Sequence, residues 1–188
     1  IQHDMTKKSD TDVFHVVDKD GNVKATKAFD SKIVKEQKSE EYARNGEIDT
    51  YDYYQIDNSD NASTLFEFMA DNTIVEWSNM EFKDGSNYVT TAHNPDGEYS
   101  SIHMLETTLS DKTLLKHTHN HTRPGLEFPS GEPRLGYSGN DIQVAIRQIN
   151  IALYNKRRPL PKFQIYISPR DSSTGGKLFI SYPRRLNK

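Results

Sequence analysis

Cysteine is missing from all 188 residues, which excludes disulfide bonds and thiolate metal sites and leaves the redox compartment undecided. Apolar residues are also sparse, at 34% of the chain with a mean hydropathy of −0.84. No run approaches the roughly eighteen apolar residues of a membrane-spanning helix. A chain of this length fits one compact domain with a sizeable core, and its low hydropathy predicts long polar loops or a loosely ordered end.

The start of the chain has neither a methionine nor the pattern of a signal sequence. We therefore expect a mature product or a piece cut from a longer protein.

The net charge of −3 hides an uneven distribution. Residues 111–188 contain 14 Lys/Arg and 5 Asp/Glu, whereas residues 1–110 contain 10 and 22. A basic half can face an anionic partner such as nucleic acid. The interpretation we favour is that the two halves neutralise each other across the fold.

Hydrophobic periodicity and turn signals predict alternating strands and helices. We expect a hairpin over 12–29, a charged helix over 31–43, a strand over 48–56 and a linker over 57–62. A short helix starts at Ser63, and strands follow over 73–82 and 88–91. The last predicted elements are a helix over 100–109, a strand over 113–121, a long helix over 140–155, and strands over 163–167 and 177–182.

Three histidines occupy alternate positions at the end of the strand predicted over 113–121: His117, His119 and His121. Alternation places their imidazoles on one face. Two such nitrogens can share one metal ion, and a third ligand from elsewhere leaves a position open for water, as in catalytic zinc sites. Asp141, twenty residues after His121 at the start of a predicted helix, is a candidate third ligand. The alternative is a solvated strand end followed by an ordinary helix cap.

Glu76 is the second candidate. In an extended strand over 73–82 it shares a face with Ile74 and Met80. A carboxylate between apolar neighbours is costly to bury without a partner, which suggests a functional acid. An edge strand that exposes this face would explain Glu76 equally well.

This order of elements and motifs resembles the JAMM (MPN+/JAB) zinc metalloproteases, whose pattern is a distant Glu, a His-x-His and a downstream Ser-x-x-Asp. Here these are Glu76, His119-Asn120-His121 and Ser138 to Asp141. His-Asn-His is similar to the lettering of the RadC branch, and the chain most resembles the JAB-like toxin domains of bacterial polymorphic toxins. The resemblance covers about residues 63–182. The chain departs from the family in two ways. Sixteen residues separate His121 from Ser138, where the family has seven, and Thr122 stands where the family has a proline.

The resemblance implies an α/β (α+β) fold of the MPN/JAB-like, cytidine deaminase-like type: a mixed β-sheet flanked by helices. It implies a metalloprotease domain over 63–188, preceded by an N-terminal extension with a β-hairpin over 1–62. It also implies a delivered effector that forms the C-terminal part of a larger protein.

The resemblance further implies the chemistry. His119, His121 and Asp141 would hold Zn²⁺, with His117 as the alternative ligand. Glu76 would act as general base and then general acid, and Ser138 would donate a hydrogen bond to the oxyanion. The substrate would be a protein, including ubiquitin-like conjugates, cleaved at a peptide or isopeptide bond. A cognate immunity protein is a further expected partner, whereas membranes and nucleic acid are not. Two other classes stay open: a metal-dependent nuclease toxin and an inactive MPN-type binding module.

Overall fold

Strands dominate the computed structural model, which describes residues 2–3, 10–44, 46–122, 129 and 141–182. The elements in chain order are β1 (Gln2–His3), β2 (Val13–Val17), β3 (Val23–Ala28), β4 (Val34–Arg44), β5 (Glu47–Ile56), α1 (Ser59–Asn72), β6 (Ser78–Phe82), β7 (Asn87–Thr91), α2 (Ser100–Glu106), β8 (Leu114–Asn120), α3 (Asp141–Tyr154), β9 (Lys162–Ile167) and β10 (Leu178–Tyr182). Among these residues, no helix combines the length and the apolar character needed to cross a membrane.

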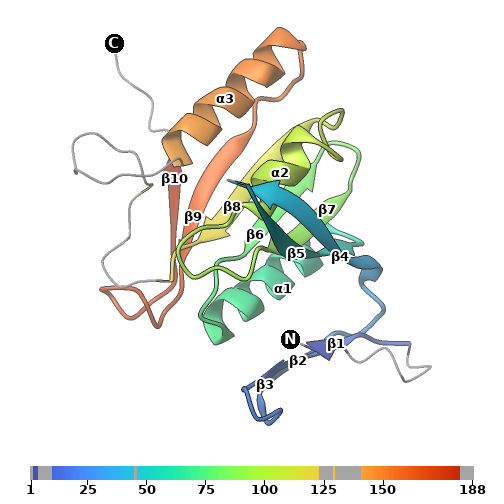
Figure 1. Cartoon of the computed structure of the whole chain (residues 1–188), viewed down its shortest axis with the longest axis vertical. Helices are drawn as coiled ribbons and strands as arrows, with labels where there is room; N and C mark the ends of the chain where they lie inside the picture. The colour runs from blue at the N-terminus through green and yellow to red at the C-terminus, as the bar shows by residue number, and fades with distance from the viewer. Residues whose placement is uncertain (1, 4–9, 45, 123–128, 130–140, 183–188) are drawn as a thin grey trace.

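A seven-stranded mixed sheet forms the centre, in the order β10-β9-β8-β6-β7-β5-β4 (Figure 1). Neighbouring strands run antiparallel except β8 and β9, which are parallel. Parallel neighbours need a crossover connection, and α3 lies in it. The predicted strand with the three histidines is therefore an interior strand of the sheet.

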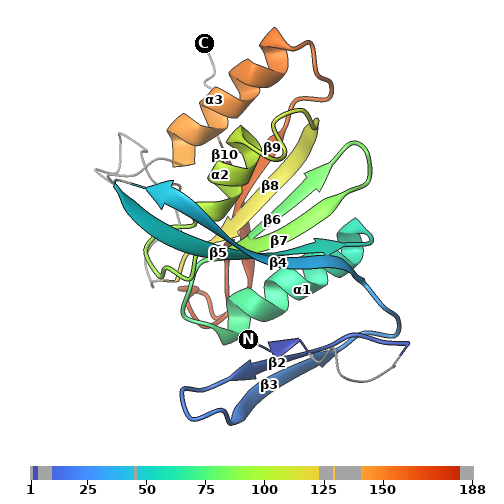
Figure 2. The same ribbon diagram turned by 45° about the vertical axis from the view of Figure 1, so that its right-hand side comes forward.

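The two faces of this sheet carry separate cores because successive residues of a strand point to opposite sides. Tyr53 belongs to one core and Tyr54 to the other, and Ile165 and Tyr166 divide in the same way. Helix α1 covers one face, and α2 and α3 cover the other (Figures 1 and 2). The tyrosines of β5 therefore pack within the cores.

The N-terminal hairpin is confirmed and belongs to a smaller antiparallel sheet, β1-β2-β3. Figure 2 shows this sheet beside α1. Phe14 of β2 is fully buried and contacts Phe29 and Tyr54 edge-on, at ring-centroid distances of 5.9 and 5.5 Å. The Asp12 carboxylate accepts the backbone N–H groups of Ile33 and Val34 at 2.7 and 2.8 Å. These contacts attach the hairpin to the main sheet.

The charged helix predicted over 31–43 is wrong, because this segment is the edge strand β4. Its Lys, Glu and Gln residues favour helices in isolation, but continuous pairing with β5 outweighs that preference. Glu40 lies opposite Tyr51 and accepts its hydroxyl at 2.6 Å. Charged residues are tolerated here because they are exposed along a sheet edge, where they also discourage pairing with other chains.

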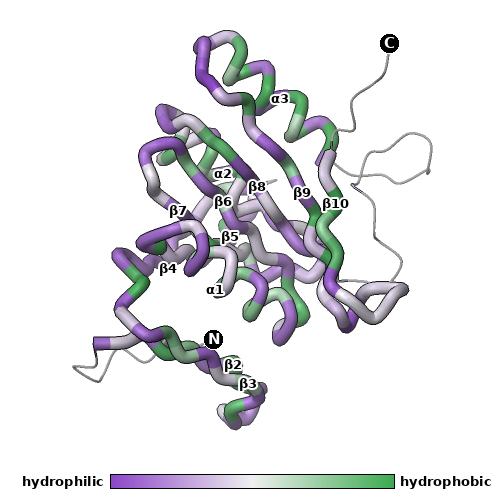
Figure 3. Tube along the Cα trace, turned by 180° about the vertical axis from the view of Figure 1, so that it is seen from behind, coloured by the Kyte–Doolittle hydropathy of each residue, from purple (hydrophilic) through white to green (hydrophobic). Residues whose placement is uncertain are grey.

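The linker predicted over 57–62 is also wrong, because α1 already begins at Ser59. The Asn58 side chain caps the helix by accepting the N–H of Asn61 at 2.9 Å. The run of polar residues hid this start, which lies four positions before the predicted one. Hydrophilic and hydrophobic residues alternate along the helices in Figure 3, as expected where one side of each packs on the sheet.

Ion pairs connect the acidic and basic parts of the sequence. Lys112 pairs with Asp84, Lys116 with Glu81 at 2.9 Å, and Arg147 with Glu106 at 2.6 Å. Lys177 of the C-terminal part likewise pairs with Glu67 of α1 at 2.7 Å. At these four positions, a basic residue of the C-terminal part is neutralised by an acidic residue of the N-terminal part.

The buried contacts of Asp12 generate a test of how the N-terminal sheet contributes to stability. Asp12→Ala would leave two backbone N–H groups without their acceptor, and we expect the free energy of unfolding to fall by about 1–3 kcal/mol. Urea denaturation measures this change. The matched control Asp20→Ala, in the exposed turn between β2 and β3, should change it by less than about 0.5 kcal/mol. Equal effects of the two substitutions would contradict the attachment.

Candidate metal centre

Three predicted ligands converge where β8 ends and α3 begins. His119 lies in β8, His121 follows the end of that strand, and Asp141 is the first residue of α3. The Nε2 atoms of the two histidines are 3.1 Å apart, and Asp141 places one oxygen 3.5 Å from His119 Nε2 and the other 3.3 Å from His121 Nε2. All three ligand atoms lie within 4.8 Å of one another, so they can hold one metal ion.

The surroundings of this cluster favour an ionised carboxylate. Burial alone would raise the pKa of Asp141, but the charges and hydrogen bonds of His119 and His121 outweigh burial and lower it well below its usual range. The two histidines are buried, and the Tyr182 hydroxyl lies 3.4 Å from His119 Nδ1. A hydrogen bond at the second ring nitrogen fixes which way a ligating imidazole faces.

Glu76 approaches the cluster from a segment that precedes β6. The strand predicted over 73–82 is therefore too long, and Ile74 is 76% exposed whereas Glu76 is buried. Burial raises the pKa of Glu76 to about 8; nearby His121 opposes this rise, whereas Asp141 and Glu98 add to it. Glu76 is therefore buried and does not lie on an exposed sheet edge, and it does not share a face with Ile74.

Asn120 holds the segment of Glu76 against β8. The side-chain oxygen of Asn120 accepts the backbone N–H of Trp77 at 2.6 Å, and the backbone N–H of Asn120 donates to the Trp77 carbonyl at 3.1 Å. The Thr91 hydroxyl donates to the Glu76 carbonyl at 2.7 Å, which attaches the same segment to β7. The residue between the two histidines thus fixes the backbone beside Glu76.

His117 lies on the same side of β8 but belongs to a different group of polar residues. Its ring is 5.7 Å from that of His119 between centroids, and its Nε2 lies 2.9 Å from the Ser101 hydroxyl and 3.3 Å from the Ser78 hydroxyl. Full burial, with a smaller contribution from His119, lowers the pKa of His117 to about 3, so the imidazole is neutral. The cluster of possible ligands does not include it.

Glu98 is a buried acid that the sequence did not single out. It accepts the Ser78 hydroxyl at 2.8 Å and the backbone N–H groups of Ser100 and Ser101 at 3.1 and 3.0 Å. Burial raises the pKa of Glu98 to about 7, against the hydrogen bonds of these serines. The available signal was a glutamate just before two serines at the start of a helix, a pattern that indicates a carboxylate accepting first-turn N–H groups.

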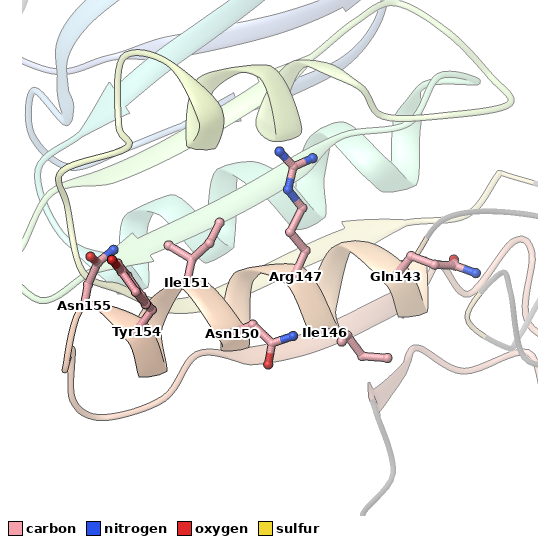
Figure 4. A pocket seen from close by; sticks show the side chains of 7 residues that line it. All are labelled: Gln143, Ile146, Arg147, Asn150, Ile151, Tyr154 and Asn155. Atoms are coloured by element: carbon pink, nitrogen blue, oxygen red, sulfur yellow. The ribbon is translucent and has the colours of Figure 1, made fainter.

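The predicted oxyanion donor, Ser138, lies outside the described residues. A pocket of about 520 Å³ lies elsewhere, along α3 (Figure 4). Its lining residues come from that helix and include Ile146, Arg147 and Tyr154, but none of the candidate ligands. The pocket is therefore not part of the candidate metal centre.

Residues 54–146 match the family model described as JAB-like toxin 1. Over this range the chain is similar to a JAB-like toxin 1 domain. The matched range of this domain includes Glu76, His119, His121 and Asp141, and it starts within β5 and ends within α3. No curated protein and no solved structure matches the chain.

The shifted pKa of Glu76 generates a prediction for the metal-free protein. The ordinary value is 4.5 and the folded value is about 8, so between these values the folded chain keeps a proton that the unfolded chain loses. This contribution to stability is complete below about pH 4.5 and is lost as the pH rises through 8.

Glu76→Gln removes this titration. We expect the unfolding free energy of the wild type, relative to this variant, to fall by up to about 1.4 kcal/mol per pH unit across this window. Urea denaturation of metal-free protein at pH 5, 6.5 and 8 measures the difference. A difference that does not change with pH would show that Glu76 ionises as freely as in the unfolded chain.

Proposed function

We propose that the chain contains a JAB-like toxin 1 domain, a zinc-dependent peptidase or isopeptidase that acts as a toxin effector. One observation carries the proposal: the convergence of His119, His121 and Asp141 next to the buried Glu76. The family match and the His–His–Asp cluster together suggest a metallohydrolase. The choice of zinc rests on the donor set, and the choice of a peptide or isopeptide bond rests on the resemblance to JAMM metalloproteases.

The donor set fits zinc. Two imidazole nitrogens and a carboxylate are ligands that zinc prefers, and no cysteine competes. In a tetrahedral site with bonds of about 2.0–2.1 Å, neighbouring ligand atoms are about 3.3 Å apart. Here the two imidazole nitrogens are 3.1 Å apart, and Asp141 has one oxygen 3.5 Å from His119 Nε2 and its other oxygen 3.3 Å from His121 Nε2. With three protein ligands, zinc bound here would keep a position for water, whose pKa it lowers to about 7.

Glu76 is the residue that would move protons. Its raised pKa, about 8 without metal, lets it hold a proton near neutral pH, and a nearby cation would favour the ionised form that accepts one. A group balanced in this way can take a proton from the attacking water and pass it to the leaving amine. The proposed role of Ser138 as hydrogen-bond donor to the oxyanion rests on the sequence motif alone.

The position of His117 supports His119 and His121 as the metal ligands. Its Nε2 already lies against two serine hydroxyls, and its ring packs 5.9 Å from Phe163. We propose that this neutral imidazole packs beside His119, two residues earlier in β8, and does not contact the ion.

The wider context follows from the resemblance. We propose an MPN/JAB-like domain over 63–188 with an N-terminal extension over 1–62, delivered as part of a larger protein and inhibited by a cognate immunity protein. The substrate would be a protein, with ubiquitin-like conjugates as one class. The acidic partners of Lys112, Lys116 and Lys177 argue against the nuclease alternative.

Metal binding is tested by substituting the histidines one at a time. We expect about one zinc per chain in the wild type, none in His121→Ala, and an affinity weakened by about ten- to a hundredfold at most in His117→Ala. Elemental analysis and competition with a zinc chelator measure these values. His15→Ala, a histidine of β2 bonded to Thr26, is the control. Stronger loss in His117→Ala than in His121→Ala would make His117 and His119 the ligands.

Activity is tested with zinc-loaded protein on ubiquitin dimers and a peptide library, with DNA and RNA in parallel. We expect cleavage of peptide or isopeptide bonds that a chelator abolishes. Glu76→Gln should retain zinc and fold while losing a factor of about a hundred or more in rate. Exclusive cleavage of nucleic acid would establish the nuclease alternative. Absence of zinc would favour the inactive binding module.

A further inference from the structure

The buried carboxylate of Glu98 joins three parts of the fold. It lies just before α2 and accepts the N–H and hydroxyl groups of Ser100 and the N–H of Ser101, at the start of that helix. Its second oxygen also accepts the Ser78 hydroxyl from β6 at 2.8 Å. Because Ser101 also lies 2.9 Å from His117 Nε2, the same cluster reaches β8. Glu98 is only 8% exposed, so these partners replace water.

The segment that ends at Glu98 holds the backbone of Glu76. The Asn94 carbonyl accepts the backbone N–H of Glu76 at 2.9 Å. In addition, the Thr122 hydroxyl, next to His121, donates to the Pro95 carbonyl at 2.6 Å. Residues 94–98 therefore bridge Glu76 and the end of the ligand-bearing strand.

We propose that Glu98 is a positioning residue: its carboxylate anchors residues 94–98 to β6 and α2, so that the Asn94 carbonyl holds the backbone of Glu76 beside the metal centre. Glu98 has no direct part in the reaction. The expected effect of Glu98 on the reaction rate rests on the proposed hydrolase function. The expected effect of Glu98 on the position of Glu76 does not depend on that function.

The chemistry of a carboxylate is needed for this role. One oxygen accepts the N–H and hydroxyl groups of Ser100, and the other accepts the Ser78 hydroxyl and the N–H of Ser101. A glutamine of the same shape has one accepting oxygen, so whichever way the amide turns, its NH₂ group faces the backbone N–H of Ser100 or of Ser101. Glu98→Gln therefore breaks one half of the anchor without opening a cavity, and Ser78→Ala removes one connection from a different element.

The first arm of the test needs no activity. Hydrogen exchange of the Glu76 amide, which donates to the Asn94 carbonyl, should be at least tenfold faster in Glu98→Gln and also faster in Ser78→Ala, as followed by NMR in zinc-loaded protein. Glu106→Gln, the same substitution at the exposed end of α2, should leave this exchange unchanged. Unchanged exchange in both Glu98→Gln and Ser78→Ala would overturn the proposal.

The second arm is kinetic and uses the substrate class found for the wild type. Glu98→Gln should lower kcat about tenfold, with KM within twofold and one zinc per chain retained. In the Glu76→Gln background, the same substitution should cause no further loss, because its effect passes through Glu76. A further tenfold loss in the double variant would overturn the proposal. A wild type without hydrolase activity would refute the proposed function, and the exchange arm would then decide the role of Glu98.

Discussion

The whole candidate centre depends on one constraint: ionisable groups taken out of water must find partners inside the protein. Glu76, Glu98, His117, His119 and His121 are each less than a tenth exposed, where an unpaired charge is costly. The fold divides them into two groups. Asp141 balances His119 and His121, whereas serines surround Glu98 and His117. The first group could hold a cation, whereas Glu98 and His117 Nε2 of the second group already contact serine hydroxyls, so neighbouring histidines of one strand have different surroundings.

Much of this arrangement follows from the sequence. Period-two spacing placed His117, His119 and His121 on one side of β8, and the apolar stripe after residue 140 located α3 and hence Asp141. Glu76 was chosen from the cost of burying a carboxylate, and that reason holds even though its predicted strand begins only at Ser78. A local sequence pattern is sufficient to predict an element where one face of that element is buried and the other is exposed.

Two of the errors come from long-range contacts, and one comes from a local cap. Residues 34–44 form a strand only because β5 lies beside them, where the Tyr51 hydroxyl donates to Glu40 on the opposite strand. Asp57 to Ala62 looks like a linker because the cap at Asn58 uses the polar residues that also mark loops. Glu98 was missed because its partners, Ser78 and the start of α2, become neighbours only in the folded sheet.

The crossover between β8 and β9 separates the ligands along the chain, with His119 and His121 before it and Asp141 after it. An ion bound to all three would act as a cross-link that closes the loop from residue 122 to residue 140. Because the ligands meet only in the folded chain, the free energy of ion binding would also be free energy of folding. The supply of metal would then control both the occupancy of the site and the docking of α3 on the sheet.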